Sequence, residues 1–216
     1  MEFPEPTEPY VLFGDFRADP DANPLKTPSG KIEIYSETIG GFEYESCGPH
    51  PVWVAPKEWL GAAAAEYPLH LISNQPRWRL HSQADVGTVS REHKVQGREA
   101  IQINPEDAKA RGIEEGEIVR VHNERGSCLA GAHISDAIRQ GVAALATGAW
   151  FDPADPGDIG SLDKHGNPNM LTRDEGTSQL AQGPVAQSTL MEIERHDGPA
   201  PEITAFTPPE TVEAAE

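Results

Sequence analysis

The sequence predicts a mostly β fold, either a barrel or a sandwich, with short helices. Six short segments between residues 68 and 195 have the apolar or alternating pattern that is typical of strands. Turn signals separate these segments at short intervals. Only one helix has clear start and stop signals, and it is short. The spacing therefore favours a barrel or sandwich over alternating β/α units.

The predicted strands are, in order, Leu69–Ser73, Ala100–Ile103, Glu117–His122, Cys128–Ile134, Val142–Ala146 and Leu190–Ile193. The first two are short and apolar, which is typical of buried strands. The third alternates with period two and is followed by the turn sequence Asn123-Glu124-Arg125-Gly126. The third and fourth strands are therefore expected to form a hairpin.

The one well-marked helix follows the second strand. Asn104 is a suitable N-cap, and Pro105 fits the first helical position. Glu106 and Asp107 favour the positive N-terminal end of the helix, and Gly112 suits a left-handed stop. We expect a connector of under two turns.

Charge and composition exclude several classes of protein. The 216 residues include 17 basic and 35 acidic side chains, which gives a net charge of −18 and disfavours nucleic-acid binding. No apolar run approaches the roughly 18 residues of a membrane span, and the N-terminus lacks the pattern of a secretory signal. The isolated Cys47 and Cys128 form neither a disulfide framework nor a zinc motif.

The charge is distributed unevenly along the chain. Residues 1–30 and 197–216 are rich in proline and acidic side chains, so we expect both ends to be extended or disordered. Residues 71–100 carry five basic and three acidic side chains, a local charge of +2. A basic region within an acidic protein indicates a small anionic ligand.

Two polar runs are candidates for a ligand site. Residues 73–83 (SNQPRWRLHSQ) follow the first strand and offer hydroxyl, amide, imidazole and guanidinium groups. Residues 167–183 (NPNMLTRDEGTSQLAQG) form the second run. Either run can be an ordinary polar loop. Alternatively, the two can bind one polar ligand from both sides.

Two other kinds of site are disfavoured. His81 and Ser82 are adjacent, so in an extended segment their side chains point to opposite faces, and no nucleophile elbow is present. A hydrolase triad is therefore not expected. The eight histidines lack the close spacing of metal ligands, and we expect no metal site made of protein side chains.

Several long strings resemble one family. LHLISNQPRWRLHSQADVG, GREAIQINPEDAKARGIEEGEIVRVHNERGSCLAGA, TGAWFDP and HGNPNMLTRDEGTSQLAQG occur in that order, preceded by TPSGKIEIYSETI and CGPHPVW. Together they resemble the C-terminal part of molybdopterin oxidoreductases of the dimethyl sulfoxide, trimethylamine N-oxide and biotin sulfoxide reductase group. The resemblance runs from about residue 10 to residue 207. It implies a six-stranded double-psi β-barrel that binds bis(molybdopterin guanine dinucleotide) molybdenum.

The resemblance also implies which residues contact the cofactor. They lie in the two polar runs, and are Ser73, Asn74, Arg79, Leu80, His81, Ser82, Gln83, Asn169, Ser178 and Gln182. Leu80 is expected to act through its backbone. Arg79 and Ser82 suit phosphate oxygens, and Asn169 and Gln182 suit the amide-like edges of pterin or guanine. The resemblance assigns no catalytic residue and no metal ligand to this chain.

The chain departs from the family in length. Family members are several times longer, and their molybdenum ligand, a serine in this group, lies in an upstream segment that nothing here resembles. We therefore expect residues 1–67 to be an extended arm with a remnant of the preceding domain, 68–195 the cofactor-binding barrel, and 196–216 an acidic tail.

This organisation implies the function of the chain. We expect it to bind the cofactor as the C-terminal domain of a molybdenum-dependent S- or N-oxide reductase and to be inactive alone. Its partners would be upstream domains or a separate chain, with no nucleic acid and no membrane. The alternatives are a stand-alone binding or interaction module and a degenerate remnant. A cytoplasmic location is expected, with a periplasmic one as the alternative.

Overall fold

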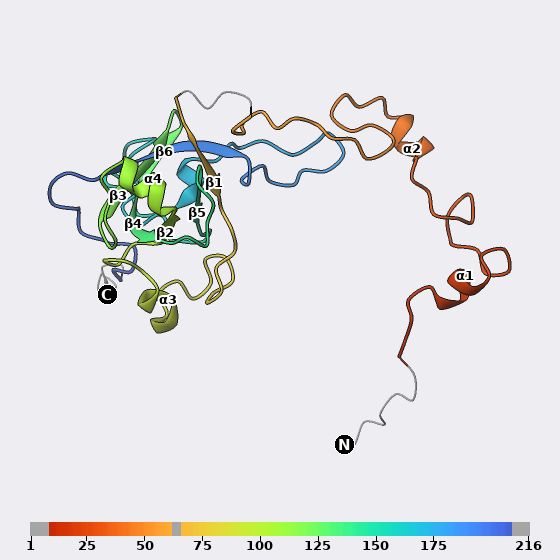
Figure 1. Cartoon of the computed structure of the whole chain (residues 1–216), viewed down its shortest axis with the longest axis horizontal. Helices are drawn as coiled ribbons and strands as arrows, with labels where there is room; N and C mark the ends of the chain where they lie inside the picture. The colour runs from red at the N-terminus through yellow and green to blue at the C-terminus, as the bar shows by residue number, and fades with distance from the viewer. Residues whose placement is uncertain (1–8, 62–65, 209–216) are drawn as a thin grey trace, which may run out of the picture. The chain divides into compact units, whose positions relative to one another are not determined.

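The computed structural model describes residues 9–61 and 66–208 (Figure 1). The described chain divides into two compact units. The first comprises residues 9–54 together with Ser178–Leu180, and the second comprises the rest. No helix in the described ranges is long and apolar enough to cross a membrane.

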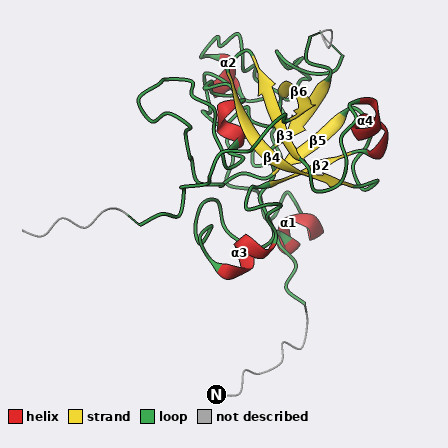
Figure 2. Cartoon of the chain, turned by 90° about the vertical axis from the view of Figure 1, so that its left-hand side faces the viewer, coloured by secondary structure: helices red, strands yellow, loops and turns green. Residues whose placement is uncertain are grey.

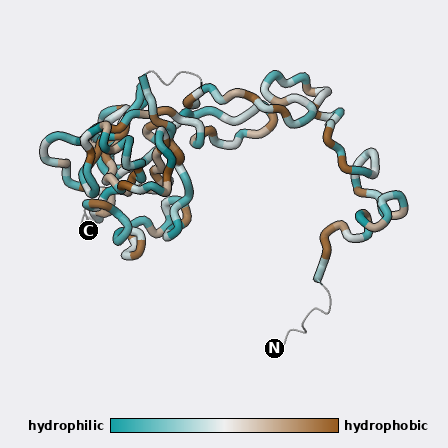
Figure 3. The backbone as a smooth tube through the Cα atoms, in the orientation of Figure 1, coloured by the Kyte–Doolittle hydropathy of each residue, from teal (hydrophilic) through white to brown (hydrophobic). Residues whose placement is uncertain are grey.

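The first unit is an extended arm. Its regular structure is limited to α1 (Gly14–Ala18) and α2 (Glu37–Gly40), and none of residues 9–54 is buried. Ser36 caps α2 by accepting a hydrogen bond from the backbone N–H of Ile39. Figure 3 shows apolar segments recurring along this unit. The predicted extended N-terminal arm is confirmed.

The second unit contains a closed barrel of six strands in the order β1-β5-β2-β4-β3-β6 (Figure 2). The strands are β1 (Leu69–Ile72), β2 (Ala100–Ile103), β3 (Ile118–Asn123), β4 (Gly126–Ile134), β5 (Val142–Leu145) and β6 (Thr189–Arg195). Each corresponds to a predicted strand, with small differences at the ends. The mostly β prediction and the six-stranded barrel that the resemblance implies are therefore confirmed.

Two of the six strand pairs are parallel. In the pair β1·β5, His70 lies opposite Val142, and in β2·β4, Ala100 lies opposite Gly131. The other four pairs are antiparallel, including the predicted hairpin β3·β4. Because parallel strands end at the same edge, the loops that follow β1 and β5 emerge side by side. This edge carries the candidate site.

The short helices follow local sequence signals. Helix α4 (Pro105–Ala110) begins as predicted, with the side chain of Asn104 accepting from the N–H of Glu106. Gly112 adopts the expected left-handed conformation, with φ of +62°. Two further elements were not predicted, α3 (Thr88–Glu92) and the 3₁₀ helix η1 (Pro168–Met170).

The core fills the barrel interior. Its buried apolar side chains come from all six strands and from the loop after η1, and they include Leu69, Ile101, Val119, Cys128, Leu145, Met191 and Leu171. Full burial of each leucine, isoleucine, valine or methionine side chain stabilises the fold by about 1.5–3 kcal/mol. The barrel thus supplies a rigid scaffold for the loops at its edge.

Candidate functional site

The loops after β1 and β5 form one pocket together with the segment around η1. The N–H of Thr147, after β5, donates to the carbonyl of Asn74, after β1, at 2.9 Å. The pocket has a volume of about 450 Å³. Its lining residues are His81, Ser82, Thr147, Gly148, Ala149, Trp150, Phe151, Asn167 and Asn169.

Gly148 allows the first two loops to touch. A Cβ atom at this position would lie 1.9 Å from the carbonyl oxygen of His81, and Gly148 has a φ of +93°. His81 is itself left-handed, with φ of +50°, a conformation that costs a non-glycine residue roughly 1–2 kcal/mol. Only a glycine at position 148 permits this backbone contact.

Trp150 fixes the relative position of these two loops. Its indole N–H donates to the carbonyl of Ser82 at 2.8 Å, and its backbone N–H donates to Asp85 at 3.0 Å. Its carbonyl accepts from Nδ1 of His165 at 2.8 Å, which places the proton of the neutral imidazole on Nδ1. Burial and the charge of Lys94 lower the pKa of His165, so the ring is neutral at pH 7.

The third wall of the pocket is built by Asp163. Its carboxylate accepts backbone N–H bonds from Asp152, His165, Gly166 and Asn167, at 2.7–3.1 Å. Burial nevertheless raises the pKa of Asp163. The Asn167 side chain then accepts from the N–H of Asn169 and starts η1. This places Asn169 at the pocket with an exposed side chain.

Beneath the pocket lies a closed ring of four buried charges. Arg79 contacts Asp85 at 3.5 Å and Glu99 at 3.0 Å, and Lys94 contacts the same two carboxylates at 2.9 Å each. All four side chains are at most 2% exposed. Burial acts to raise the pKa of Asp85, but the hydrogen bond from Lys94 and the cationic neighbours outweigh it and lower that pKa.

Arg79 is buried and bonded to groups of its own chain. Its guanidinium donates inward to the Ser90 hydroxyl, to Glu99 and to the carbonyls of His81 and Thr147. The Arg79 side chain is completely buried, so these bonds direct its guanidinium away from solvent. Arg79 therefore holds the His81 and Thr147 loops together. Its contact with a phosphate stays a prediction.

The predicted basic region is also not one accessible surface. Lys94 lies in the buried ring, and the Arg98 guanidinium donates to the carbonyls of Gln96 and Pro201. Of the five basic residues between 71 and 100, only Arg77 and Arg91 are exposed. Three of the five cations of this region, Arg79, Lys94 and Arg98, therefore bond to carboxylates or carbonyls inside the protein.

The other predicted residues of the first run surround the pocket without lining it. Ser73 is buried, and its backbone exchanges hydrogen bonds with the Gln187 side chain. Asn74 contributes the carbonyl that accepts from Thr147. Leu80 and Gln83 are exposed and close a tight turn, in which the N–H of Gln83 donates to the Leu80 carbonyl.

The far end of the second run forms a separate turn. The Thr177 side chain donates to the Ala181 carbonyl. Gln182 lies against Gly176, because a Cβ atom built on Gly176 would be 1.9 Å from the side-chain oxygen of Gln182. Ser178 belongs to the first unit, beside Gln179, which hydrogen-bonds Ser46. Of the predicted site residues, the structure thus brings His81, Ser82 and Asn169 together in the pocket.

The residues after β5 were not predicted as site residues. Thr147, Gly148, Ala149, Trp150 and Phe151 form one complete wall. Their signal in the sequence is a glycine followed by two adjacent aromatic residues directly after a strand. The signal becomes informative only when β5 is known to run parallel to β1.

The pocket offers polar hydrogen-bonding groups and aromatic side chains. Amide side chains at Asn167 and Asn169 can each donate and accept, as the edges of a pterin or guanine ring require. Within the described ranges, no group of three His, Cys, Asp or Glu side chains could hold a metal ion. The donor set therefore fits a polar heterocyclic ring.

Comparison with known proteins identifies the family. The family model described as "Molydopterin dinucleotide binding domain" matches residues 69–190. The chain is 47% identical over 205 residues to a dimethyl sulfoxide/trimethylamine N-oxide reductase of Rhodobacter capsulatus. It is 50% identical over 212 residues to a trimethylamine-N-oxide reductase of Salmonella typhimurium. These alignments cover 94% and 97% of the chain but 25% of each relative, so the chain spans about a quarter of their length.

A solved structure shows the same fold at low sequence identity. Acetylene hydratase from Pelobacter acetylenicus matches 82% of this chain and 25% of its own, with a TM-score of 0.65 and 21% identity. This similarity concerns the fold alone. The family model covers more than half of the chain and includes strands β1 to β5 and the start of β6. The chain belongs to the molybdopterin dinucleotide-binding domain family.

Proposed function

We propose that the chain is the cofactor-binding domain of a molybdenum-dependent S- or N-oxide reductase and holds bis(molybdopterin guanine dinucleotide). One observation carries the proposal. The loops after β1 and β5 and the segment around η1 converge on a pocket of about 450 Å³ whose lining suits a polar fused ring. This volume lies within the range of about 300–1,000 Å³ that is common for small-molecule sites.

Each part of the lining has a role in this proposal. Asn169, exposed at the pocket, pairs with the amide-like edge of a ring, and His81 and Ser82 offer further polar contacts. Trp150 and Phe151 supply aromatic surface. When bound, the cofactor would supply the two-electron removal of an oxygen atom, and this chain would bind and orient it.

Phosphate binding does not depend on Arg79 in this proposal. Because its guanidinium is buried and paired, phosphate oxygens would contact hydroxyl groups and backbone N–H groups of the same loops. Ser82 and Thr147 are the hydroxyl residues that line the pocket. In this proposal, the serine ligand of the metal comes from an upstream segment of the complete enzyme.

The exposed apolar side chains of the arm support the proposal that the chain packs against further polypeptide. Large apolar side chains are exposed along it, such as Tyr10 at 88%, Ile34 at 76% and Trp53 at 74%. Contiguous exposed apolar surface marks contact with another protein surface. We propose that the arm packs against polypeptide that corresponds to the remaining three quarters of the relatives, whether in the same chain or in a separate one.

Co-expression tests the proposed function. The Salmonella typhimurium relative, with its own matching quarter deleted, is expressed with and without this chain. We expect the chain to restore molybdenum and guanine nucleotide content together with reduction of trimethylamine N-oxide or dimethyl sulfoxide. A complex that forms with folded chain but contains neither metal nor nucleotide would contradict the proposal.

The same apolar arm also favours a second candidate, a non-catalytic interaction module. In that case the chain would bind a partner through the arm without holding the cofactor. Sedimentation equilibrium and guanine-nucleotide titration of the purified chain separate the two. Self-association or partner binding without any nucleotide affinity supports the module, and nucleotide affinity supports the cofactor domain.

A further inference from the structure

The segment that follows the barrel is anchored back onto it by buried charges. We use the name C-terminal strap for residues 201–206. Asp152 accepts two hydrogen bonds from Thr204, from its N–H at 2.7 Å and from its hydroxyl at 2.6 Å. Lys164 also donates to the Thr204 hydroxyl, and Arg98 donates to the carbonyl of Pro201 at 2.6 Å. Asp152, Lys164 and Arg98 are each less than 10% exposed.

The strap ends in an aromatic contact behind the pocket. The Phe206 ring lies edge-on to Trp150, with 5.4 Å between ring centroids, and edge-on to His165 at 4.9 Å. Trp150 lines the pocket, and His165 holds the Trp150 carbonyl. Phe206 therefore touches both residues that set the position of this wall, without lining the pocket itself.

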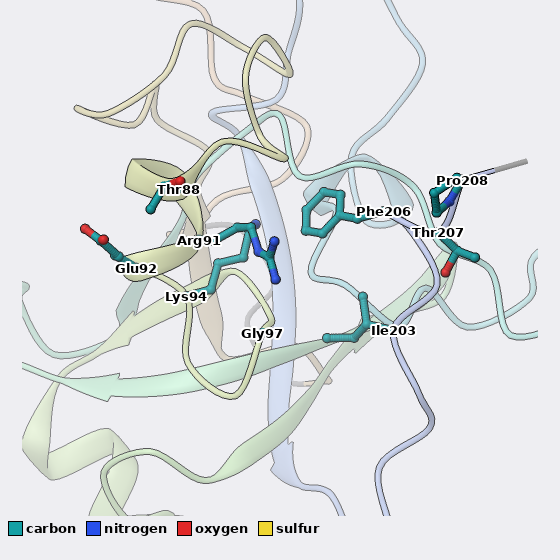
Figure 4. Close-up of a pocket in the computed structure, with 9 residues that line it drawn as sticks. All are labelled: Thr88, Arg91, Glu92, Lys94, Gly97, Ile203, Phe206, Thr207 and Pro208. Carbon is teal, nitrogen blue, oxygen red and sulfur yellow. The ribbon is translucent and has the colours of Figure 1, made fainter.

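The opposite side of Phe206 borders a hollow of about 740 Å³ between α3 and the strap. Figure 4 shows Arg91 and Phe206 facing each other there, with the guanidinium carbon 5.8 Å from the ring centroid. Phe206 is thus outside the barrel core, open to the hollow on one side and packed on the aromatic wall on the other. A change at Phe206 should affect that wall more than the barrel.

We propose that the C-terminal strap is a positioning element of the cofactor pocket, with Thr204 and Phe206 as its positioning residues. Thr204 fixes the strap to Asp152, which directly follows the pocket residue Phe151 in the chain. Phe206 then holds the Trp150 indole against the Ser82 carbonyl. The inference rests on the proposed function, because it assigns the strap to the same site. It gives residues beyond β6 a role in ligand binding.

The first measurement needs no cofactor. Hydrogen exchange of the Trp150 indole N–H is followed by NMR in the purified chain, with the signal identified by its loss in Trp150→Phe. Because Phe206 packs on this ring, Phe206→Ala should speed the exchange about tenfold or more, and Thr204→Val should act in the same direction. Phe206→Tyr should restore slow exchange. Ile203→Ala, in the same strap and bordering the same hollow, is the matched control.

The second measurement uses the co-expressed complex. Phe206→Ala should lower retained molybdenum and guanine nucleotide several-fold, while Ile203→Ala retains both. Unchanged indole exchange and unchanged retention in Phe206→Ala would overturn the strap proposal, provided that the wild type binds cofactor. A different result is a wild-type complex that contains no cofactor, together with faster Trp150 indole exchange in Phe206→Ala. That result would contradict the proposed function and leave the strap as a positioning element of the pocket wall.

Discussion

The guanidinium of Arg79 lies 3.0 Å from the carboxylate of Glu99, and both side chains are buried. The two residues come from different segments, since Arg79 precedes α3 and Glu99 directly precedes β2. Asp85 and Lys94 complete the ring, so its formal charges cancel. Since Arg79 also donates to the carbonyls of His81 and Thr147, the ring connects the barrel to two walls of the pocket.

Arg79→Ala should destabilise the fold. It leaves the carboxylates of Asp85 and Glu99 with Lys94 as their remaining cation, and removing one partner of a buried ion pair costs about 3–5 kcal/mol. Urea unfolding measures this loss. Arg77→Ala removes an exposed arginine two positions away and should change stability by no more than about 0.5 kcal/mol. Equal stability of the two variants would mean that the ring contributes nothing.

Gly148→Ala should be much more harmful than a matched glycine substitution. Gly160 has a similar φ of +89° but nothing within 4 Å of a Cβ atom, whereas a Cβ at Gly148 would overlap the His81 carbonyl. Backbone strain alone should cost Gly160→Ala about 1–2 kcal/mol. The added overlap should cost Gly148→Ala at least about 2 kcal/mol more. Thermal unfolding of both variants gives the comparison, and similar losses would show that the two loops separate easily.

Asn169→Ala should weaken ligand binding and leave the fold intact. Its side chain is exposed at the pocket, and alanine keeps the backbone N–H that donates to the capping side chain of Asn167. Loss of one amide contact should reduce guanine-nucleotide affinity about tenfold. Gln140→Ala, at an exposed position outside the lining and outside both polar runs, serves as the control. Calorimetric titration checks both variants, and an unchanged affinity of Asn169→Ala would remove it from the site.

His165 should make stability depend on pH. Burial and Lys94 lower its folded-state pKa, against the opposing effects of the Trp150 carbonyl, Asp85 and Asp163. The unfolded histidine takes up a proton below about pH 6.5, whereas the folded one remains neutral to lower pH. Its contribution to stability is therefore complete above about pH 6.5 and decreases as pH falls, by at most about 1.4 kcal/mol per pH unit.

Urea unfolding at about pH 7.5 and about pH 5.5 tests this dependence, because the two values lie on either side of the unfolded pKa. His165→Asn removes the titrating group and should show a smaller loss between them. An identical loss in wild type and variant would assign the effect to other groups. The lowered pKa of Asp85 adds a separate loss of stability only below about pH 4.

The two cysteines should differ in reactivity. Burial raises the pKa of Cys128 well above its usual value, and the charge of Asp163 adds to the effect. Cys47 is partly exposed. Because the thiolate is the reactive species, a thiol reagent at pH 8 should label Cys47 in the native protein and both thiols in urea. Rapid native labelling of Cys128 would show that the barrel opens under these conditions.

Local patterns in the sequence determined the barrel strands. An apolar or alternating run predicts a strand because side-chain direction alternates along it, and each of the six runs became a strand. The Asn104 cap and the left-handed Gly112 were also predictable, since both depend on neighbouring residues only. The short helix α3 lacks such signals, because its N-cap residue is Gly87, which has no side chain to accept a capping hydrogen bond.

The pocket was only partly predictable. His81, Ser82 and Asn169 lie in the two polar runs of the sequence, and the structure joins them in one site. The wall from Thr147 to Phe151 depends on β5 lying parallel to β1, a pairing between strands about 70 residues apart. No local pattern specifies that pairing.

The sequence by itself thus determined the fold class, the strands and the polar loops, because these depend on the order of neighbouring side chains. The tertiary structure alone decided what the charged and aromatic groups contact. In the sequence, Arg79 could equally face a phosphate or a carboxylate, and Glu99, its partner, is 20 positions away. Likewise, Phe206 meets Trp150 only because the strap returns to the barrel. Buried charges must be paired, and which partners pair is set by the packing of distant segments.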